Sequence, residues 1–126
     1  MEATFKIDGR LIGLNDIIGR ANHNRYAGAA LKKTELRRVT MWIMAGNVPT
    51  FTTPVEISFR WIEKDNRRDI DNIAAGGTKV ILDALVELHR LPNDGRKWVK
   101  RIEHCFPDPD AKNPRVEVKI KSISAA

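Results

Sequence analysis

The sequence predicts a single α+β domain, in which helices cover one face of a small mixed β-sheet. Apolar and polar residues alternate at 55–63 and at 115–122, which is typical of strands with one buried face. Apolar residues at 29–45 instead recur near every 3.6 positions, as they do in an amphipathic helix. Because both patterns occur within 126 residues, we expect one domain over residues 1–126 with two main helices.

The N-terminal part predicts short elements before the first long helix. Residues 4–7 and 11–12 are expected to form a strand pair, with Asp8-Gly9 as its two-residue turn. Asn15 or Asp16 is suited to capping a short helix through Ile18. The polar residues at 20–28 predict a loop, and the helix at 29–45 is expected to end at Gly46-Asn47.

A second helix is predicted after the strand at 55–63 and is expected to end near His89. Its apolar positions between 73 and 88 fit one stripe, but Gly76 and Gly77 interrupt it. The helix therefore begins either at Thr78 or at Asp71, and in the second case the glycines would permit the close approach of a backbone or a ligand.

The C-terminal part predicts a turn at 91–95, a strand at 96–106 and a last strand at 115–122. Trp98, Ile102 and Phe106 are expected on one face of the first of these strands. Cys105 lies in its alternating pattern and is expected to be an inert, packed thiol.

Composition restricts the classes of function. The net charge of +6 and the pI of 9.8 favour a polyanionic partner, with nucleic acid first. A single cysteine excludes an internal disulfide and suits a reducing cytoplasm, and with three scattered histidines it provides no zinc-site spacing. We expect a cytoplasmic protein without a membrane segment, because no apolar run approaches about 20 residues.

Three carboxylates are candidate metal ligands. Asp69 and Asp71 follow the strand at 55–63, and Asp94 lies in the turn before the next strand. If the three converge they need protons or a divalent cation, and Mg²⁺, with Mn²⁺ as an alternative, prefers such oxygen ligands. Lys79 lies about 80° around a continuous helix from Asp71, where it would stabilise charge on a phosphate. The alternatives are a polar turn in which Asp71 or Asn72 only caps a helix, and a surface lysine.

Basic residues around these acids are candidate contacts to DNA phosphates. Lys33 and Arg37 lie one turn apart on the predicted helix at 29–45, so that they share a face. The alternative is a solvated basic surface. The full set of candidate DNA-binding residues is Arg25, Lys32, Lys33, Arg37, Arg67, Arg68, Arg96 and Lys97.

Several of these motifs together resemble the RusA family of Holliday junction resolvases, and its phage and prophage branch above all. The resemblance rests on Arg68-Asp69-Ile70-Asp71-Asn72, on the residues at 79–85 and on Asn93-Asp94 with the strand that closes the chain. It extends over about residues 14–120, and also includes the segments at 24–28 and 91–95.

The resemblance implies a homodimeric, magnesium-dependent endonuclease that cuts four-way DNA junctions symmetrically, in a bacterial host cell. It implies that Asp69, Asp71 and Asp94 bind the metal and that Lys79 is needed for cleavage. The chain departs from the family in two places: residues 74–77 lengthen the gap between the acidic pair and Lys79, and Asn93 stands where the family often has an acid.

Two other functions remain open from the sequence: a non-catalytic protein that binds branched DNA, and a different magnesium-dependent phosphohydrolase. For the implied dimer, the face that carries Phe59, Trp61 and Trp98 is a candidate interface, because a domain of this size need not bury all three aromatic residues. The alternative is that they are ordinary core residues.

Overall fold

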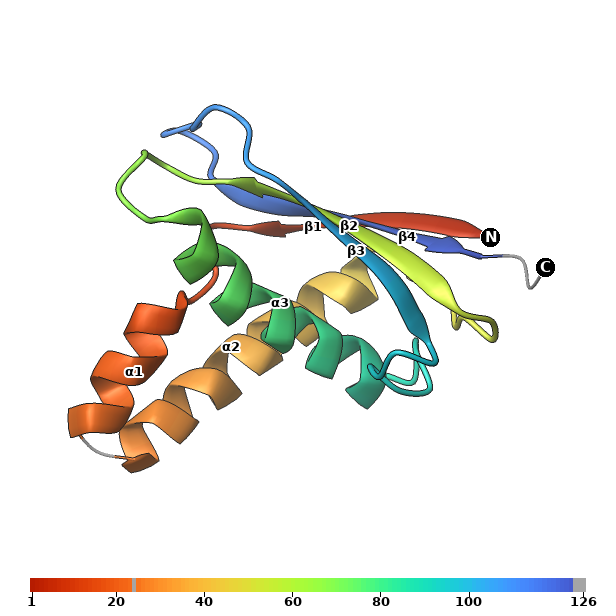
Figure 1. Cartoon of the computed structure of the whole chain (residues 1–126), viewed down its shortest axis with the longest axis horizontal. Coiled ribbons are helices and arrows are strands. Elements are labelled where there is room, and N and C mark those ends of the chain that lie inside the picture. Colours follow the sequence, from red (N-terminus) through yellow and green to blue (C-terminus); the bar gives the residue numbers. More distant parts are fainter. Residues whose placement is uncertain (24, 124–126) are drawn as a thin grey trace.

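The structure is a computed structural model that describes residues 1–23 and 25–123. Within these residues four strands and three helices follow one another, and Figure 1 shows their arrangement. In order they are β1 (Glu2–Asp8), α1 (Leu14–His23), α2 (Arg25–Ala45), β2 (Val55–Ile62), α3 (Ile70–Glu87), β3 (Val99–Cys105) and β4 (Arg115–Ser122).

The strands form one mixed sheet in the order β1-β4-β2-β3. β4 pairs antiparallel with both β1 and β2, whereas β3 pairs parallel with β2 after the crossover through α3. All three helices lie on the same face of this sheet (Figure 1). The predicted α+β class is therefore confirmed, with three helices in place of two.

The core lies between the sheet and the helices. Val39 and Ile43 of α2 and Ile81 and Leu85 of α3 are fully buried against the inward residues of β2, which include Phe59 and Trp61. Phe59 and Trp61 are thus ordinary core residues, and the prediction that their face forms a dimer contact is wrong for both. Trp98 is half-buried in the loop before β3.

Several predicted elements agree with the structure. The last strand has the predicted bounds, and β2 ends one residue before the predicted limit. α3 is continuous from Ile70 to Glu87, so the helix that contains Asp71 is the correct alternative. Asn47 has a positive φ of 51° directly after α2, as expected for a residue that ends a helix.

Other predictions are wrong, and each error has a tertiary cause. Residues 20–28 belong mostly to α1 and α2, because this helical pair packs against the rest of the helix layer. β3 begins only at Val99, since the residues before it form turns. Cys105 is exposed because β3 is an edge strand, so the prediction of a packed thiol fails.

Residues 11 and 12 do not form a strand, although Gly9 does turn the chain with a φ of +80°. The backbone of residues 8–13 is held instead by side chains from two sides. Arg38 donates to the carbonyl oxygens of Asp8 and Arg10 at 2.7 and 2.6 Å. Side-chain partners therefore replace the strand partners that these backbone groups lack.

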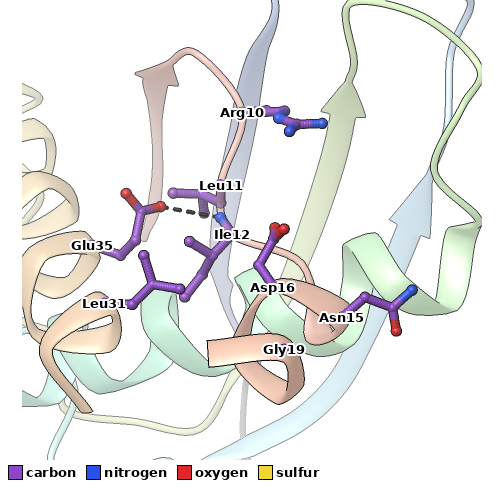
Figure 2. A pocket seen from close by; sticks show the side chains of 8 residues that line it. All are labelled: Arg10, Leu11, Ile12, Asn15, Asp16, Gly19, Leu31 and Glu35. Atoms are coloured by element: carbon purple, nitrogen blue, oxygen red, sulfur yellow. Dashed lines mark hydrogen bonds between the residues drawn. The ribbon is translucent and has the colours of Figure 1, made fainter. Parts of the chain in front are cut away.

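The 8–13 segment also borders a hollow of about 650 Å³ between α1 and α2. Figure 2 shows Leu31 and Glu35 of α2 on one side of it and Asn15 and Asp16 of α1 on the other. Glu35 is buried, accepts a hydrogen bond from the Ile12 amide at 3.1 Å, and is paired with Arg38. The carboxylate of Glu35 in this hollow is therefore used to support the chain.

The helix α3 crosses the 8–13 segment so closely that the two backbones are in direct contact. A Cβ atom on Gly76 would lie 2.4 Å from the Ile12 carbonyl oxygen, and one on Gly77 would lie 2.6 Å from the Trp61 ring. Both distances are shorter than any real carbon contact. The two glycines in the helix are therefore explained by the close approach that the sequence predicted as one alternative.

This crossing leads to the first prediction. Gly76→Ala should lower the free energy of unfolding by roughly 1–3 kcal/mol, because the new methyl group forces the backbones apart. Gly19→Ala is the matched control. Gly19 is also helical but has nothing within 4 Å of a built Cβ, so alanine should stabilise the protein by up to about 1 kcal/mol. Urea denaturation measures both, and equal effects at the two sites would contradict the crossing.

Candidate functional site

The candidate site begins with the acidic pair at the start of α3. Asp69 is the N-cap residue, but its side chain makes no capping hydrogen bond. Asp71 lies in the first turn and accepts a hydrogen bond from the Asn72 amide at 2.9 Å. Both residues are exposed, and neither forms an ion pair within the part of the chain that the structure describes. The partial positive charge of a helix N-terminus stabilises two carboxylates in this position.

Asn72 fixes the acidic pair relative to α1. Its Oδ1 atom accepts a hydrogen bond from the Asn15 amide at 2.7 Å, and so caps the start of α1 from a neighbouring helix. Asp16 adds a second cap, because its Oδ2 accepts from the Gly13 amide at 2.9 Å. The prediction that Asp16 caps a helix is confirmed, whereas Asn72 caps α1 and not the helix to which it belongs.

Lys79 lies further along α3, between two carboxylates. Its Nζ is 3.0 Å from both Asp83 Oδ1 and Asp94 Oδ2. These hydrogen bonds, with Asp83 first and Asp94 second, raise the pKa of Lys79 above its ordinary value. Its side chain is still mostly exposed, so the arrangement presents a protonated ammonium group to solvent.

The acidic pair and the lysine cluster are separate groups. Asp71 precedes Lys79 by eight residues, which is about 12 Å along a helix. Residues 74–77 supply one complete turn of this distance, about 6 Å. Among the residues described, no three or more His, Cys, Asp or Glu side chains are close enough to hold one metal ion. The structure thus brings Asp94 to Lys79 and leaves Asp69 and Asp71 as a pair.

The donor chemistry of this pair fits a hard divalent cation. Mg²⁺ keeps several waters and is commonly bound through one or two carboxylates together with phosphate oxygens of a substrate. Asp69 and Asp71 provide two carboxylates that no cation of the described chain neutralises. They are the residues that would hold such an ion.

The predicted DNA-binding residues fall into groups. Lys32, Lys33 and Arg37 are exposed on α2, and the two lysines share a groove of about 220 Å³ with Lys79 and Asp83 of α3. Arg96 and Lys97 are exposed in the loop between α3 and β3. Arg25 was also predicted to bind DNA, but its side chain lies outside the part of the protein that the structure describes.

Arg67 and Arg68 differ completely in their surroundings. The Arg67 side chain is 86% exposed beside Asp65, whereas the Arg68 side chain is only 10% exposed. Arg68 donates to both carboxylate oxygens of Glu63, at 2.6 and 2.8 Å, and to the Leu11 carbonyl oxygen at 2.9 Å. The guanidinium of Arg68 is thus used inside the protein, and the structure gives it a structural role.

Glu63 is the buried partner that the sequence analysis missed. The inward positions of β2 are Val55, Ile57, Phe59 and Trp61, and Glu63 continues this series by one step. A carboxylate at a position expected to be apolar requires a buried cation nearby. That departure from the alternating pattern was the signal that could have identified the ion pair with Arg68.

No protein-family model matches the sequence, and no curated protein matches it. None of the helices in the described part of the chain has the length and apolarity required to cross a bilayer.

The contrast between the neighbouring arginines gives the second prediction. Arg68→Ala should lower the free energy of unfolding by about 3–5 kcal/mol, because it leaves the buried Glu63 carboxylate without a counterion. Arg67→Ala removes the same group one residue earlier from a solvated side chain, and should change stability by less than about 0.5 kcal/mol. Thermal or urea unfolding tests both. Similar losses for the two variants would show that the Arg68–Glu63 pair does not support the fold.

Proposed function

We propose that the protein is a magnesium-dependent endodeoxyribonuclease that cuts four-way DNA junctions. The observation that carries this proposal is the exposed, unpaired Asp69–Asp71 carboxylate pair at the N-terminus of α3, on a protein of net charge +6. The resemblance of the same residues to resolvases supports the choice of substrate. Basic side chains on α2, close to α3, support a polyanion as the ligand.

Each group at the site has a chemical role in this proposal. Asp69 and Asp71 hold the cation, which, when bound, polarises a phosphodiester and makes a coordinated water more acidic. Lys79, about 12 Å further along α3, donates hydrogen bonds to another phosphate of the DNA backbone and so helps to position the substrate. Asp83 and Asp94 keep Lys79 protonated and oriented. The groove that Lys32 and Lys33 share with Lys79 then guides the DNA backbone towards the acidic pair.

Symmetric resolution of a junction also requires two sites. One chain provides one Asp69–Asp71 pair, whereas a homodimer with twofold symmetry provides two that match the symmetry of the substrate. The proposal therefore includes a dimer as the active species.

A second candidate is a protein that binds branched DNA without cutting it. The observation that favours it is the contact of Asp94 with Lys79, which leaves two carboxylates in place of three at the acidic pair. Cleavage of a synthetic four-way junction beside a linear duplex, with and without Mg²⁺, separates the two functions. Magnesium-dependent cuts in the junction alone support the nuclease, and tight binding with no cut supports the alternative.

The third prediction concerns the metal ligands. Asp71→Asn should abolish junction cleavage and preserve junction binding, because it removes a carboxylate ligand and no basic group. Glu87→Gln makes the same change of charge on an exposed residue at the opposite end of α3, and should retain cleavage. Single-turnover cleavage and a gel-shift assay measure the two properties. If Asp71→Asn cuts at the wild-type rate, Asp71 is not a metal ligand.

The fourth prediction concerns the basic face of α2. Junction affinity should fall with salt, with a log–log slope of roughly 0.9 for each neutralised phosphate. The double variant Lys33→Ala/Arg37→Ala should make that slope shallower by roughly 1–2.

Lys119 and Lys121 provide a matched control, because both are exposed on β4. Their outward positions place them on the sheet face that the helices leave open. Lys119→Ala/Lys121→Ala removes the same charge and should leave the slope unchanged. If the salt slope becomes shallower in the β4 control and stays unchanged in the α2 variant, the DNA binds on the opposite side of the protein.

A further inference from the structure

The strand β3 has one free edge. It is the terminal strand of the sheet and pairs with β2 alone, so its outer backbone groups have no strand partner among the described residues. An edge of this kind is a template for pairing with another chain unless it is blocked. After an irregularity at Lys100, residues 101–105 are in regular register with β2, so the segment is suited to accept a further strand.

The order of side chains along this edge is complementary to itself. Arg101 and Glu103 lie on either side of Ile102, on the open face of the sheet, while Ile102 lies on the helix face with His104. If two β3 strands pair antiparallel about Ile102, Arg101 of each chain lies opposite Glu103 of the other. A centre at Arg101 or at Glu103 would place like charges against each other, which disfavours those registers.

The surface beside this edge is apolar and hollowed. Ile102 is 39% exposed, although it points to the helix face of the sheet. A hollow of about 340 Å³ lies between α3 and β3, and half of its lining residues have small side chains. It is lined by Ala74, Ala75, Thr78, Lys79, Leu82 and His104. Alanine and threonine on an exposed helical flank permit another helix to approach closely.

His104 keeps this flank rigid and adds no positive charge to it. Its Nδ1 accepts a hydrogen bond from Trp61 Nε1 at 2.9 Å, and its ring stacks on Phe59 and Trp61. Burial lowers the pKa of His104, so that the imidazole is neutral at pH 7. In the self-paired register His104 lies opposite Lys100 of the other chain, where a neutral ring avoids repulsion.

We propose that β3 pairs antiparallel with β3 of a second copy of this chain, centred on Ile102. The flank of α3 that carries Ala74, Ala75 and Thr78 then packs against the same flank of the second copy. The twofold axis is perpendicular to the sheet, so that eight strands form one continuous sheet and all helices lie on one side of it. This places the dimer of the proposed function at an edge distinct from the Phe59–Trp61 face, which is buried. The acidic pairs at the N-termini of the two α3 helices then lie at opposite ends of the interface.

Charge reversal tests the register. Arg101→Glu places two carboxylates opposite each other at each end of the interface, and should raise the dimer dissociation constant roughly tenfold in sedimentation experiments. The double variant Arg101→Glu/Glu103→Arg restores opposite charges across the interface and should return the constant to near the wild-type value. Within one chain these side chains form an exposed pair at 2.6 Å, which contributes little to stability. An unchanged constant for Arg101→Glu, or a wild-type protein that is monomeric at tens of micromolar, would overturn the proposal.

Cross-linking tests the same geometry without reference to charge. In a Cys105→Ser background, Ile102→Cys should form an intermolecular disulfide under mild oxidation, because Cα atoms of directly opposed residues are about 4.5–5.5 Å apart. Lys100→Cys is the control on the same exposed strand, since its symmetry mate lies four positions away, about 13 Å. Equal or faster cross-linking at position 100 would refute the register.

Neither measurement depends on nuclease activity. A dimer with this register that fails to cut junctions would refute the proposed function alone. A nuclease whose dimerisation is insensitive to positions 101 and 102 would refute the interface alone.

Discussion

The helix layer of this protein depends on the way in which two arginine–glutamate pairs, one buried and one partly buried, hold the 8–13 segment. Arg38, paired with Glu35, binds carbonyl oxygens on one side of the segment, and Arg68, paired with Glu63, binds the Leu11 carbonyl on the other. This segment connects the first strand to the helices and passes directly beneath α3. These donors satisfy carbonyl groups of a segment that has no strand partner, and the charge on each guanidinium strengthens the hydrogen bonds.

The same ion pairs determine where the candidate site lies. Arg68 directly precedes Asp69, so its bond to Glu63 anchors the loop from which the acidic pair projects. Asn72 then ties the first turn of α3 to the start of α1. The exposed carboxylates are thus mounted on a backbone that is fixed from both sides. A rigid support of this kind is what a metal-ligand pair needs if its geometry is to survive the binding of a large substrate.

Residue patterns were sufficient to predict the sheet and its helical cover, because a period of two or of 3.6 reflects burial directly. The last strand was located to the residue, and the structure shows that Asp69 and Asp71, which their spacing made candidate ligands, are both exposed. The 8–13 segment was misassigned because its partners are side chains from distant parts of the sequence, which no local pattern reveals. Arg68 was grouped with Arg67 for the same reason, since residue type alone does not distinguish a buried guanidinium from a solvated one.

The separation of Asp94 from Asp69 and Asp71 could be found only from the three-dimensional structure. Asp94 was expected beside Asp69 and Asp71, yet it contacts Lys79. Residues 74–77 lie between the acidic pair and Lys79 in the sequence, but the distance that they impose depends on α3 being continuous through both glycines. Once that continuity is known, the turn that they form accounts for about 6 Å of the distance between the acidic pair and the lysine.

The order of strands has a consequence for the synthesis of the chain. β4 is the last strand to be made, yet it lies between β1 and β2 and pairs with both. Until residues 115–122 leave the ribosome, the N-terminal strand has no neighbour in the sheet, and the inward residues of β1 and β2 lack Val116, Val118 and Ile120 beside them. Between the synthesis of β1 and that of β4, the nascent chain therefore presents incomplete strands with free edges. Such a chain depends on fast closure of the sheet once β4 is available, or on a chaperone, to avoid pairing with its neighbours.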